Sequence, residues 1–504
     1  CNPTAQMAPP GSTRRLGSAL RPRTGVAAPR ARREGAGRRL VESEGAEGAG
    51  GEQQAGAFPP PWLLPFLVPA LGGALFGFDI GSSSAVVRIL GEGTSDLGAL
   101  SAIQLGYVAS GSLAGAMLAS ATLIFAGDAK IGRRQELTLA SLLFATGTAL
   151  QATAGTLPLV LAGRAIYGLG IGTAMHAAPL YIGETAPDDL RGKLVSLKEG
   201  AIVIGIVAGY AVGAAFAGQG GAWHSVYASA LPAEALMLAG TLVVPESARW
   251  LALRGRPEEA VQSLCASQGL PEETAAAQVA KMKPAGEAPS VAANIGKLTQ
   301  PGVNRKALTI GVGLVLLQQL SGQPSVLYYA NRIFERAGLG FEAAVAVGLF
   351  KFGMTLVSVN LVEDPKWGRR PLLILGTSGM TVSLLILSAL FSGGAESINQ
   401  AAVLATIFAY VGFYQIGFGP ITWLILSEVF PLEIRSAAVS VGTLANFGSN
   451  LLVTLLFELE RQSLGESLVF LQFAVVAGFA VWFQSTFVPE TRGLSLEDIE
   501  AKIR

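Results

Sequence analysis

The stretch Pro179-Leu-Tyr-Ile-Gly-Glu184-Thr-Ala-Pro187-Asp-Asp-Leu-Arg191 ends one long apolar run, and its second part returns later in the chain. There Glu428-Val-Phe-Pro431-Leu-Glu-Ile-Arg435 keeps the spacing Glu-x-x-Pro-x-x-x-Arg, again where an apolar run ends. Such a copy indicates a repeated unit, and a repeat at a fixed period decides the architecture of a chain.

Two further segments recur in the same order. Gly127-Asp128-Ala-Lys-Ile-Gly132-Arg133-Arg134 returns as Glu363-Asp364-Pro-Lys-Trp-Gly368-Arg369-Arg370, and Pro245-Glu246-Ser247 returns as Pro489-Glu490-Thr491. All three pairs lie about 240 residues apart and in register, which predicts two equivalent halves.

The composition points to a membrane protein. The chain has 504 residues, of which 51% are hydrophobic and 14% are charged. Soluble domains usually carry about 25% charged residues, so a polytopic membrane protein is expected. The net charge of +1 gives no argument for a nucleic-acid partner. Cys1 and Cys265 lie outside metal-binding spacings, and no nucleophile–base set stands out, so we expect no cofactor and no enzyme.

Residues 1–58 are rich in alanine, glycine and arginine. Nine arginines precede residue 40, and the first acidic residue is Glu34. Transit peptides of plastids and mitochondria are Arg-rich, Ser-rich and poor in acids, and this tail fits except for its scarce serine. A disordered basic tail is the alternative, and both interpretations stay open. The sequence begins at Cys1 rather than methionine, which leaves open whether an N-terminal piece is missing.

From Trp62 onward the sequence consists of apolar stretches about twenty residues long, enough for a helix to cross about 30 Å of hydrocarbon. The expected spans are 62–89, 102–126, 136–155, 157–183, 194–217, 223–244, 306–330, 341–362, 371–393, 401–426, 436–457 and 466–488. The repeated segments fall at equivalent places in each group of six spans. The predicted fold class is an all-α integral membrane protein with twelve transmembrane helices in two pseudo-symmetric six-helix bundles.

The spans divide the chain into five parts. These are the tail 1–58, an N-terminal bundle 59–244, a linker 245–305 with short amphipathic helices, a C-terminal bundle 306–488 and a tail 489–504. Lysine and arginine concentrate in the loops after spans 2, 4, 8 and 10. The positive-inside rule therefore places both termini and the linker on the cytoplasmic or stromal side.

Asp79 lies well inside the first span, in Leu75-Phe76-Gly77-Phe78-Asp79. An ionised carboxylate at membrane depth is costly, so it is a functional candidate by default. Its natural partner is Arg164 in the fourth span. The pair is either a proton-coupling site or a static link between two helices. We favour the proton site, because burial raises the pKa of a carboxyl group and a nearby cation lowers it, which suits a group that binds and releases a proton.

The repeated loops and helix ends carry acids and bases in both halves. They are Arg133, Glu184 and Arg191 in the first half and Arg369, Glu428 and Arg435 in the second. One interpretation is a set of inter-helix ion pairs that close the positive side and break when it opens. The alternative is charge that only sets topology, and the identical spacing in both halves favours the gate.

The seventh span is interrupted by Gln318-Gln319-Leu-Ser-Gly322-Gln323-Pro324. Irregular backbone at membrane depth is tolerated where it lines a cavity. Carboxamides donate and accept hydrogen bonds, as vicinal hydroxyls require, and aromatic rings can cover the C–H face of a sugar. Trp423 and Asn446 could complete such a pocket, whereas the lone His176 and His224 are taken as structural.

Together these residues resemble the sugar porter family of the major facilitator superfamily. The likeness runs from about Trp62 to the C-terminus and rests on the two Gly-Arg-Arg segments, Pro179-x-Tyr181-x-x-Glu184, Pro245-Glu246-Ser247-x-Arg249-Trp250-Leu251, Pro420-x-x-Trp423-x-x-x-Ser427-Glu428 and Val488-Pro489-Glu490-Thr491-x-Gly493. The segment Gln323–Ala330 is similar to the plant and algal xylose–proton symporter-like and vacuolar glucose transporters.

The resemblance implies roles for individual residues. Asp79 would be the proton-coupling aspartate and Arg164 its partner. The positions that match the family's sugar site are Phe76, Gln318, Gln319, Tyr328, Trp423 and Asn446. Glu199 stands where many relatives have a sugar-contacting glutamine, and Pro324 stands where they have an asparagine. Asp128 and Asp364 lie one residue further from Gly-Arg-Arg than is usual.

The predicted function is secondary transport of a monosaccharide, glucose or xylose, by alternating access with proton symport. A proton-independent facilitator is the alternative, followed by a non-transporting sugar receptor. The expected partners are the sugar, the proton and the lipid bilayer, and the chain is compatible with a monomer. The arginine-rich tail favours the plastid envelope over a vacuolar or plasma membrane.

Overall fold

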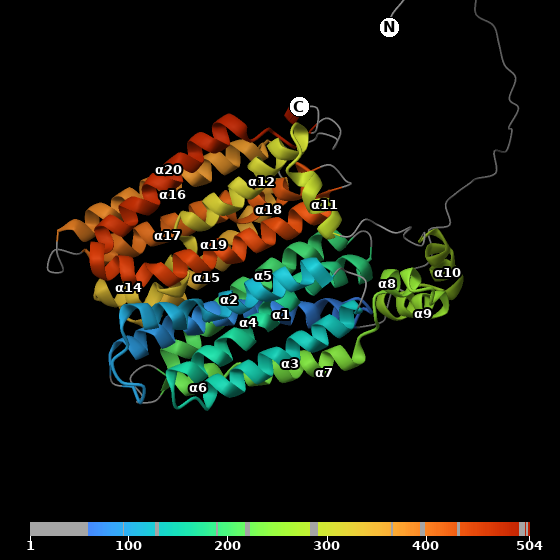
Figure 1. The fold of residues 1–504 in the computed structure, drawn as a ribbon, viewed down its shortest axis with the longest axis horizontal. Coiled ribbons are helices and arrows are strands. Elements are labelled where there is room, and N and C mark those ends of the chain that lie inside the picture. Colours follow the sequence, from blue (N-terminus) through green and yellow to red (C-terminus); the bar gives the residue numbers. More distant parts are fainter. Residues whose placement is uncertain are drawn as a thin grey trace, which may run out of the picture. The chain divides into compact units, whose positions relative to one another are not determined.

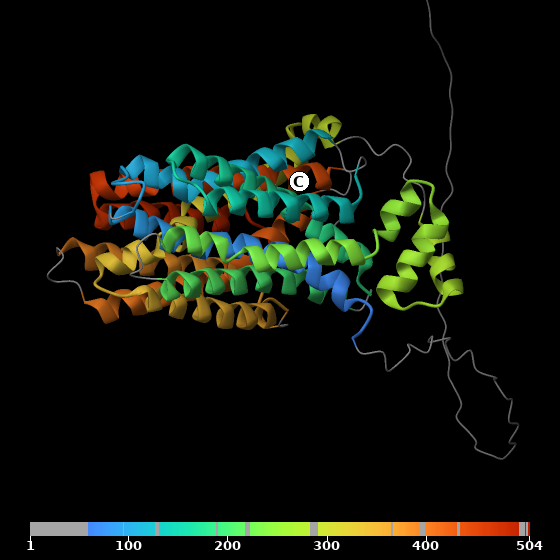
Figure 2. The ribbon, with the colours of Figure 1, turned by 90° about the horizontal axis from the view of Figure 1, so that it is seen from below.

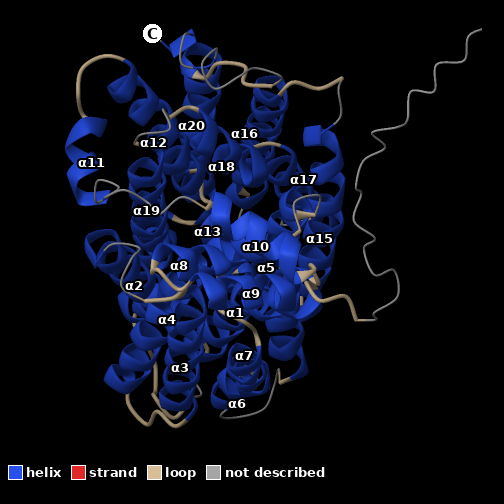
Figure 3. Cartoon of the chain, turned by 90° about the vertical axis from the view of Figure 1, so that its right-hand side faces the viewer, coloured by secondary structure: helices blue, strands red, loops and turns tan. Residues whose placement is uncertain are grey.

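The computed structural model describes residues 59–93, 95–126, 131–187, 190–216, 222–282, 291–363, 366–393, 399–430, 434–492, 499 and 502–503. The tail 1–58, with its predicted transit peptide, lies outside these residues. So do Asp128 and Asp364. Every described element is a helix, and Figure 3 shows them from one end.

The first half contains α1 (Leu63–Gly91), α2 (Ala102–Ala126), α3 (Arg133–Ala152), α4 (Leu157–Thr185), α5 (Arg191–Ala215), α6 (Ala222–Ala228) and α7 (Leu231–Val243). Four short helices follow: α8 (Ala248–Leu253), α9 (Pro257–Gln268), α10 (Glu272–Lys281) and α11 (Val291–Leu298). The second half contains α12 (Val303–Leu320), α13 (Gln323–Tyr328), α14 (Ala330–Arg336), α15 (Phe341–Glu363), α16 (Arg369–Ser392), α17 (Gln400–Ile416), α18 (Phe418–Glu428), α19 (Arg435–Leu464) and α20 (Glu466–Phe487).

Among the described residues, ten segments are long and apolar enough to cross a membrane. The two remaining expected spans are α3, which begins with the charged residues Arg133, Arg134 and Glu136, and the α12–α14 segment, which is broken into short pieces. Burial explains why both are tolerated, since α3 packs against α4 and α7, and α12 packs against α18, α19 and α20. The predicted all-α membrane fold is confirmed.

The two halves form separate bundles that meet along two equivalent lines. Within the halves, α1 packs on α5, α2 and α3 pack on α4, and α16 packs on α17 and α20. Between the halves, α2 packs on α19 and α5 packs on α15. The repeat makes α2 equivalent to α15 and α5 equivalent to α19, so a two-fold operation exchanges the two contacts. Figure 1 shows the lengthwise helices of both halves.

The helices α8, α9 and α10 make a small cluster with its own apolar core, which includes Leu251, Ala260, Leu264 and Val279. In Figure 2 they lie beyond the ends of the long helices, at the end where α3 begins and α7 ends. The end of the bundles that carries these helices is called the linker end below, and the other is called the α14 end.

Two long spans are broken at glycines. Gly322 lies between α12 and α13 with φ of 86°, a left-handed conformation that favours glycine. A Cβ at this position would also lie 2.3 Å from the ring of Phe473. The break between α17 and α18 at Gly417 was not expected, although Pro420 was visible in the sequence and proline cannot donate the helical hydrogen bond to residue 416.

Candidate functional site

A buried ion pair lies in the core of the first bundle. Arg164 on α4 donates from Nη1 to Asp79 Oδ1 on α1 over 2.5 Å, and both side chains are almost completely buried. Ser112 on α2 donates to Asp79 Oδ2 over 2.6 Å and accepts from Arg164 Nη2 over 2.9 Å. Three helices therefore meet at one carboxylate, and the predicted neighbours Asp79 and Arg164 are in contact.

The close approach of α2 and α4 makes this contact possible. Gly168 on α4 packs so tightly that a Cβ there would lie 1.9 Å from the carbonyl oxygen of Ser112. Small residues allow helices in membranes to pack backbone against backbone. The sequence offered no signal for Ser112, because a serine in an apolar span carries no charge.

An amide cluster lies in the second bundle. Gln318 Nε2 on α12 donates to the carbonyl oxygen of Phe418 over 2.5 Å. Gln319 Nε2 donates to Asn446 Oδ1 on α19 over 2.5 Å and to Gln318 Oε1 over 3.2 Å. The structure therefore brings Asn446 to the neighbouring residues Gln318 and Gln319, from which it is far apart in the sequence. The oxygen of Gln319 is buried without a hydrogen-bond partner, so the cluster has an unused acceptor.

The predicted aromatic residues lie on both bundles, and a contact of Phe76 reaches the neighbour of Asn446. Phe76 on α1 makes an edge contact with Phe447, next to Asn446, at 6.2 Å between ring centroids. Trp423 lies on α18, five residues after Phe418, and is 37% exposed. Tyr328 on α13 is buried, and its hydroxyl has no hydrogen-bond partner.

Tyr328 lies where the second bundle packs against the helix of Asp79. It lies on α13, which belongs to the second bundle and packs against α1 of the first. The helix that carries Asp79 therefore lies against α13, which directly follows the break after α12.

Two of the buried charged groups that sequence reasoning missed are Glu234 and Lys351. Glu234 on α7 accepts from Thr148 over 2.6 Å, and its second oxygen is buried without a partner. Lys351 on α15 is 5% exposed and donates to Gln415 over 2.7 Å. Both lie inside apolar spans, and that signal could have found them. The predicted Glu199 on α5 is exposed and pairs with Lys198 at 2.8 Å.

At the linker end of the first bundle, charged groups tie helix termini together. Arg133 Nε lies 3.8 Å from Glu184 Oε2, which links α3 to α4. Ser247 donates to the same oxygen of Glu184 over 2.5 Å. Glu246 accepts from the backbone nitrogen of Arg134 over 2.9 Å, and an acid is favourable at a helix N-terminus.

The second bundle repeats this arrangement. Arg369 Nη1 donates to Glu428 Oε2, which links α16 to α18. Glu490 accepts from the backbone nitrogens of Arg369 and Arg370, each over 3.1 Å. The described pairs each lie within one bundle. Arg191 has an exposed side chain at the start of α5, and the side chain of Arg435 lies outside the described residues.

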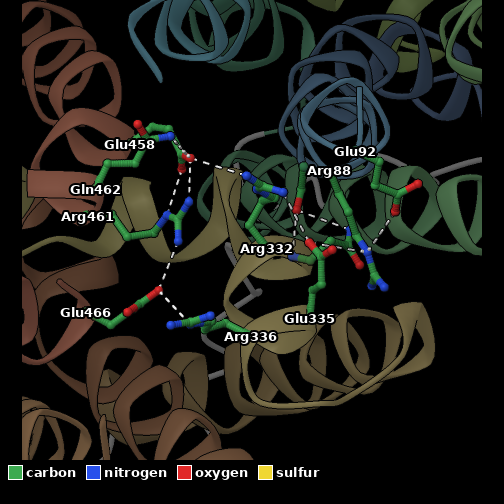
Figure 4. A network of polar contacts seen from close by, with 11 residues as sticks. Arg88, Glu92, Arg332, Glu335, Arg336, Glu458, Arg461, Gln462 and Glu466 are labelled. Atoms are coloured by element: carbon green, nitrogen blue, oxygen red, sulfur yellow. Dashed lines mark hydrogen bonds and ion pairs between the residues drawn. The ribbon is translucent and has the colours of Figure 1, made fainter. Parts of the chain in front are cut away.

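The α14 end carries a second charged network, which sequence reasoning missed (Figure 4). Glu335 on α14 lies 3.7 Å from Arg88 on α1 and 3.3 Å from Arg332. Arg332 lies 3.3 Å from the fully buried Glu458 on α19. The network continues through Arg461 to Glu466 and Arg336. The Arg88–Glu335 pair joins the two bundles, so this end is held closed.

The two histidines have structural partners. His176 Nδ1 lies 2.9 Å from Glu136 Oε2. His224 stacks on Trp223, and both rings contact Asp96 in the loop before α2. Burial alone would raise the pKa of Asp96, but the hydrogen bonds from Trp223 and His224 lower it. Within the described part of the chain, no group of three metal-binding side chains comes together.

Two bundles that meet around buried polar residues, with an ionic contact closing one end, define a polytopic membrane transporter. The family model described as "Sugar (and other) transporter" matches residues 66–503. The chain belongs to this family of sugar transporters. The predicted resemblance to the sugar porters is confirmed, and so is the expectation of a transporter rather than an enzyme.

Individual relatives give the same result. The chain is 44% identical over 467 residues to D-xylose-proton symporter-like 3, chloroplastic, of Arabidopsis thaliana, with 88% of this chain and 82% of that protein covered. D-xylose-proton symporter-like 2 of the same plant is 43% identical, with 87% and 90% covered. The inward-open conformation of the xylose transporter XylE from E. coli aligns with a TM-score of 0.74 at 28% identity, covering 87% of this chain and 98% of that chain.

Proposed function

We propose that the protein is a proton-coupled monosaccharide symporter that carries glucose or xylose by alternating access. The observation that carries this proposal is the Asp79–Arg164 pair, a titratable carboxylate buried in the bundle core with Ser112 as its third partner. The relatives named as xylose–proton symporters support it. A facilitator needs no titratable group at this place.

Proton binding to Asp79 would weaken the electrostatic attraction between its carboxyl group and Arg164. An ionised carboxylate stabilises a buried guanidinium strongly, and its protonation removes that stabilisation. The helix α1, which carries Asp79, packs against α13 of the second bundle. Protonation would therefore alter the contact between the bundles, which is the requirement for coupling.

The sugar would bind at the amide cluster of Gln318, Gln319 and Asn446. Their carboxamides can donate to and accept from neighbouring hydroxyls, and the unpaired oxygen of Gln319 is one available acceptor. Phe76 and Trp423 would cover the apolar face of the ring. The cluster belongs to the second bundle, and the contact of Phe76 with Phe447 brings the first bundle beside it; secondary transporters bind their substrates between two such bundles.

The charged ends would alternate during transport. In this conformation Arg88 and Glu335 hold the α14 end closed. The pairs Arg133–Glu184 and Arg369–Glu428 are each formed within one bundle in this conformation. We propose that these residues, together with Arg191 and Arg435, close the linker end when the opposite state forms. We also propose that the linker end and both termini face the cytoplasmic or stromal side, because the positively charged loops favour that orientation.

The plastid envelope is the proposed membrane, and the protein is proposed to work as a monomer. The arginine-rich residues 1–58 are the basis for this location. A fluorescent reporter fused to residues 1–58 should enter plastids in plant cells. A reporter that stays in the cytosol would move the proposal to the vacuolar or plasma membrane.

Vesicles containing the purified protein test the function as a whole. Uptake of radiolabelled glucose and xylose is measured with and without an imposed pH gradient. A symporter accumulates sugar above the external concentration only with the gradient. Equal uptake under both conditions would indicate a facilitator, and sugar binding without any uptake would indicate a receptor.

A further inference from the structure

An ionic contact separate from the network of Figure 4 holds the loop between α1 and α2. Asp96 in this loop accepts from Trp223 Nε1 at Oδ1 over 2.8 Å, and its Oδ2 lies 3.1 Å from His224 Nε2. Trp223 and His224 are the second and third residues of α6, and Trp223 is fully buried. The loop is therefore fastened to the first bundle by two neighbouring rings.

The partners of His224 require a proton on each ring nitrogen. Nδ1 lies 3.1 Å from the carbonyl oxygen of Ala152, the last residue of α3, which can only accept a hydrogen bond. Nε2 faces Asp96, whose ionised carboxylate also only accepts. A neutral imidazole carries one proton and would point its remaining lone pair at an oxygen. The arrangement therefore fits the imidazolium cation, whose charge Asp96 balances.

The stacking of the two rings favours the same charged form. His224 lies on Trp223 with 3.6 Å between the ring centroids and 29° between the planes. The face of an indole attracts a cation electrostatically. Trp223 therefore contributes twice, because it donates to Asp96 and also stabilises the charge on His224.

The helices that pack against α6 contribute little charge near this ring. They include α1, α3 and α5. Residues 137–152 of α3 and 201–216 of α5 contain no acid, lysine, arginine or histidine, and Tyr210 of α5 directs its hydroxyl to a carbonyl of α13. The end of α1 brings Arg88 and Glu92, which pair with each other at 3.8 Å. The charge of the imidazolium is therefore balanced by the loop rather than by a neighbouring helix.

The same loop begins at the contact that closes the α14 end. Arg88 lies in the last turn of α1 and pairs with Glu335 of the second bundle, and Glu92 directly follows α1 (Figure 4). Asp96 follows Glu92 by four residues, which span at most about 14 Å. A loop that is held at Asp96 therefore steadies the end of α1 and its ionic contact with α14.

Of the groups in this contact, His224 is the one that titrates near neutral pH. Histidine changes its charge between about pH 5 and pH 8. Burial alone would raise the pKa of Asp96, but the hydrogen bonds from Trp223 and His224 lower it, so the carboxylate stays ionised in this range. Loss of the proton from His224 would leave a lone pair facing an oxygen, and Trp223 alone would then hold the loop.

We propose that His224 is a pH-sensitive positioning residue, which as an imidazolium fastens the α1–α2 loop through Asp96 and thereby favours closure of the α14 end. Loss of the proton in a less acidic compartment loosens the loop and raises the share of molecules that are open at this end. The inference rests on the alternating access of the proposed function, but it does not require proton coupling at Asp79.

The accessibility of a buried thiol tests the inference. Ser84 on α1 is fully buried and accepts from the backbone and side-chain nitrogens of Asn331 on α14 over 3.0 and 3.2 Å, so Ser84→Cys reports opening of this end. Cys1 and Cys265 are replaced, and a membrane-impermeant maleimide is added to vesicles in which the α14 end faces outward. Ser463→Cys, which is exposed at the same end, corrects for the pH dependence of the thiol reaction itself.

Corrected labelling in the parent should rise about two- to fivefold from about pH 5.5 to about pH 8, as expected when a partly exposed ion pair is lost. His224→Arg keeps the positive charge at every pH, so labelling should stay low. His224→Phe keeps the stacked ring and removes the charge, so labelling should be high and independent of pH, and Asp96→Asn should act alike. His176→Asn, the matched control at the linker end, should keep the rise of the parent.

Equal rises in the parent, His224→Arg and His224→Phe would overturn the inference while sugar transport stands. If His224→Phe does not fold, His224→Arg decides alone, because a fixed positive charge must remove the rise. The rise should also persist in Asp79→Asn, and a rise that is lost there but kept in His224→Arg would overturn the assignment to His224.

The failure of the proposed function gives a different result. A parent that shows the rise but accumulates no sugar in response to a pH gradient would contradict proton coupling, and this inference would stand. A thiol at Ser84→Cys that reacts at no pH, with or without glucose, would overturn the opening of the α14 end, and the inference with it.

Discussion

Asp79 illustrates what single residues reveal. A carboxylate and a guanidinium in separate apolar spans predict a partnership, and the structure places Arg164 2.5 Å from Asp79. Ser112 could not be predicted in the same way, because a neutral serine gains its importance only from the packing of α2 on α4. Lys351 could have been found, since a lysine within an apolar span is as conspicuous as Asp79.

At the residue scale, the amide cluster yields a prediction. Gln319→Ala removes the donor that reaches Asn446 and Gln318, together with the unpaired acceptor. Sugar affinity should fall about tenfold, the value of roughly one to two hydrogen bonds. Isothermal titration calorimetry on the purified protein measures the sugar affinity. Gln472→Ala, an exposed glutamine on α20, should bind like the parent, and equal binding by both variants would remove Gln319 from the site.

At the scale of elements, length and hydrophobicity predicted the long helices well. The expected spans 102–126 and 341–362 nearly coincide with α2 and α15. The break after α12 was expected from the polar side chains and Pro324, whereas the break at Gly417 was not. A break inside an otherwise apolar run depends on a neighbour that replaces the lost hydrogen bonds or fills the bend, and one sequence does not show that neighbour.

The break at Gly322 yields a prediction about stability. Gly322→Ala places a Cβ on a residue with φ of 86° and 2.3 Å from Phe473. Backbone strain and the clash together should cost about 2 kcal/mol or more. The thermal unfolding midpoint in detergent should fall by several degrees. Gly353→Ala on α15, which has open space around it, should leave the midpoint unchanged. An unchanged midpoint in Gly322→Ala would show that the break is not fixed by this residue.

At the scale of the whole molecule, the internal repeat was the basis of the most extensive prediction from the sequence. Three short segments in register predicted two equivalent bundles, and the exchanged contacts α2–α19 and α5–α15 follow the same symmetry. The network at the α14 end was not predicted, because Arg88, Glu335 and Glu458 belong to no repeat and lie far apart in the sequence. Which charges meet across two bundles depends on their relative placement, which one sequence does not encode locally.

The same network predicts how the bundles are held together. Glu335→Gln removes the charge that Arg88 contacts across the interface, so the population should shift toward a state open at the α14 end. Labelling of a cysteine introduced on α14, with Cys1 and Cys265 replaced, reports the shift. Arg88→Gln should act alike, and the double variant should show no further change. Additive effects of the two substitutions on labelling would contradict a direct pair. As a control, Glu342→Gln at the same end should label like the parent.

The central claim, that protons drive sugar transport through Asp79, is tested most directly by Asp79→Asn in vesicles. The variant keeps the size of the side chain and removes the titrating charge. Accumulation of sugar driven by a pH gradient should be lost, while exchange of sugar down its own gradient should survive because the amide cluster is intact. Glu342→Gln, the matched control, should accumulate sugar like the parent.

A purely static pair predicts another result. Arg164 would then remain buried without a counter-charge, and folding and exchange would fall together with accumulation. The thermal midpoint of the purified variant separates the two cases. A folded Asp79→Asn variant that still accumulates sugar in response to a pH gradient would contradict the account.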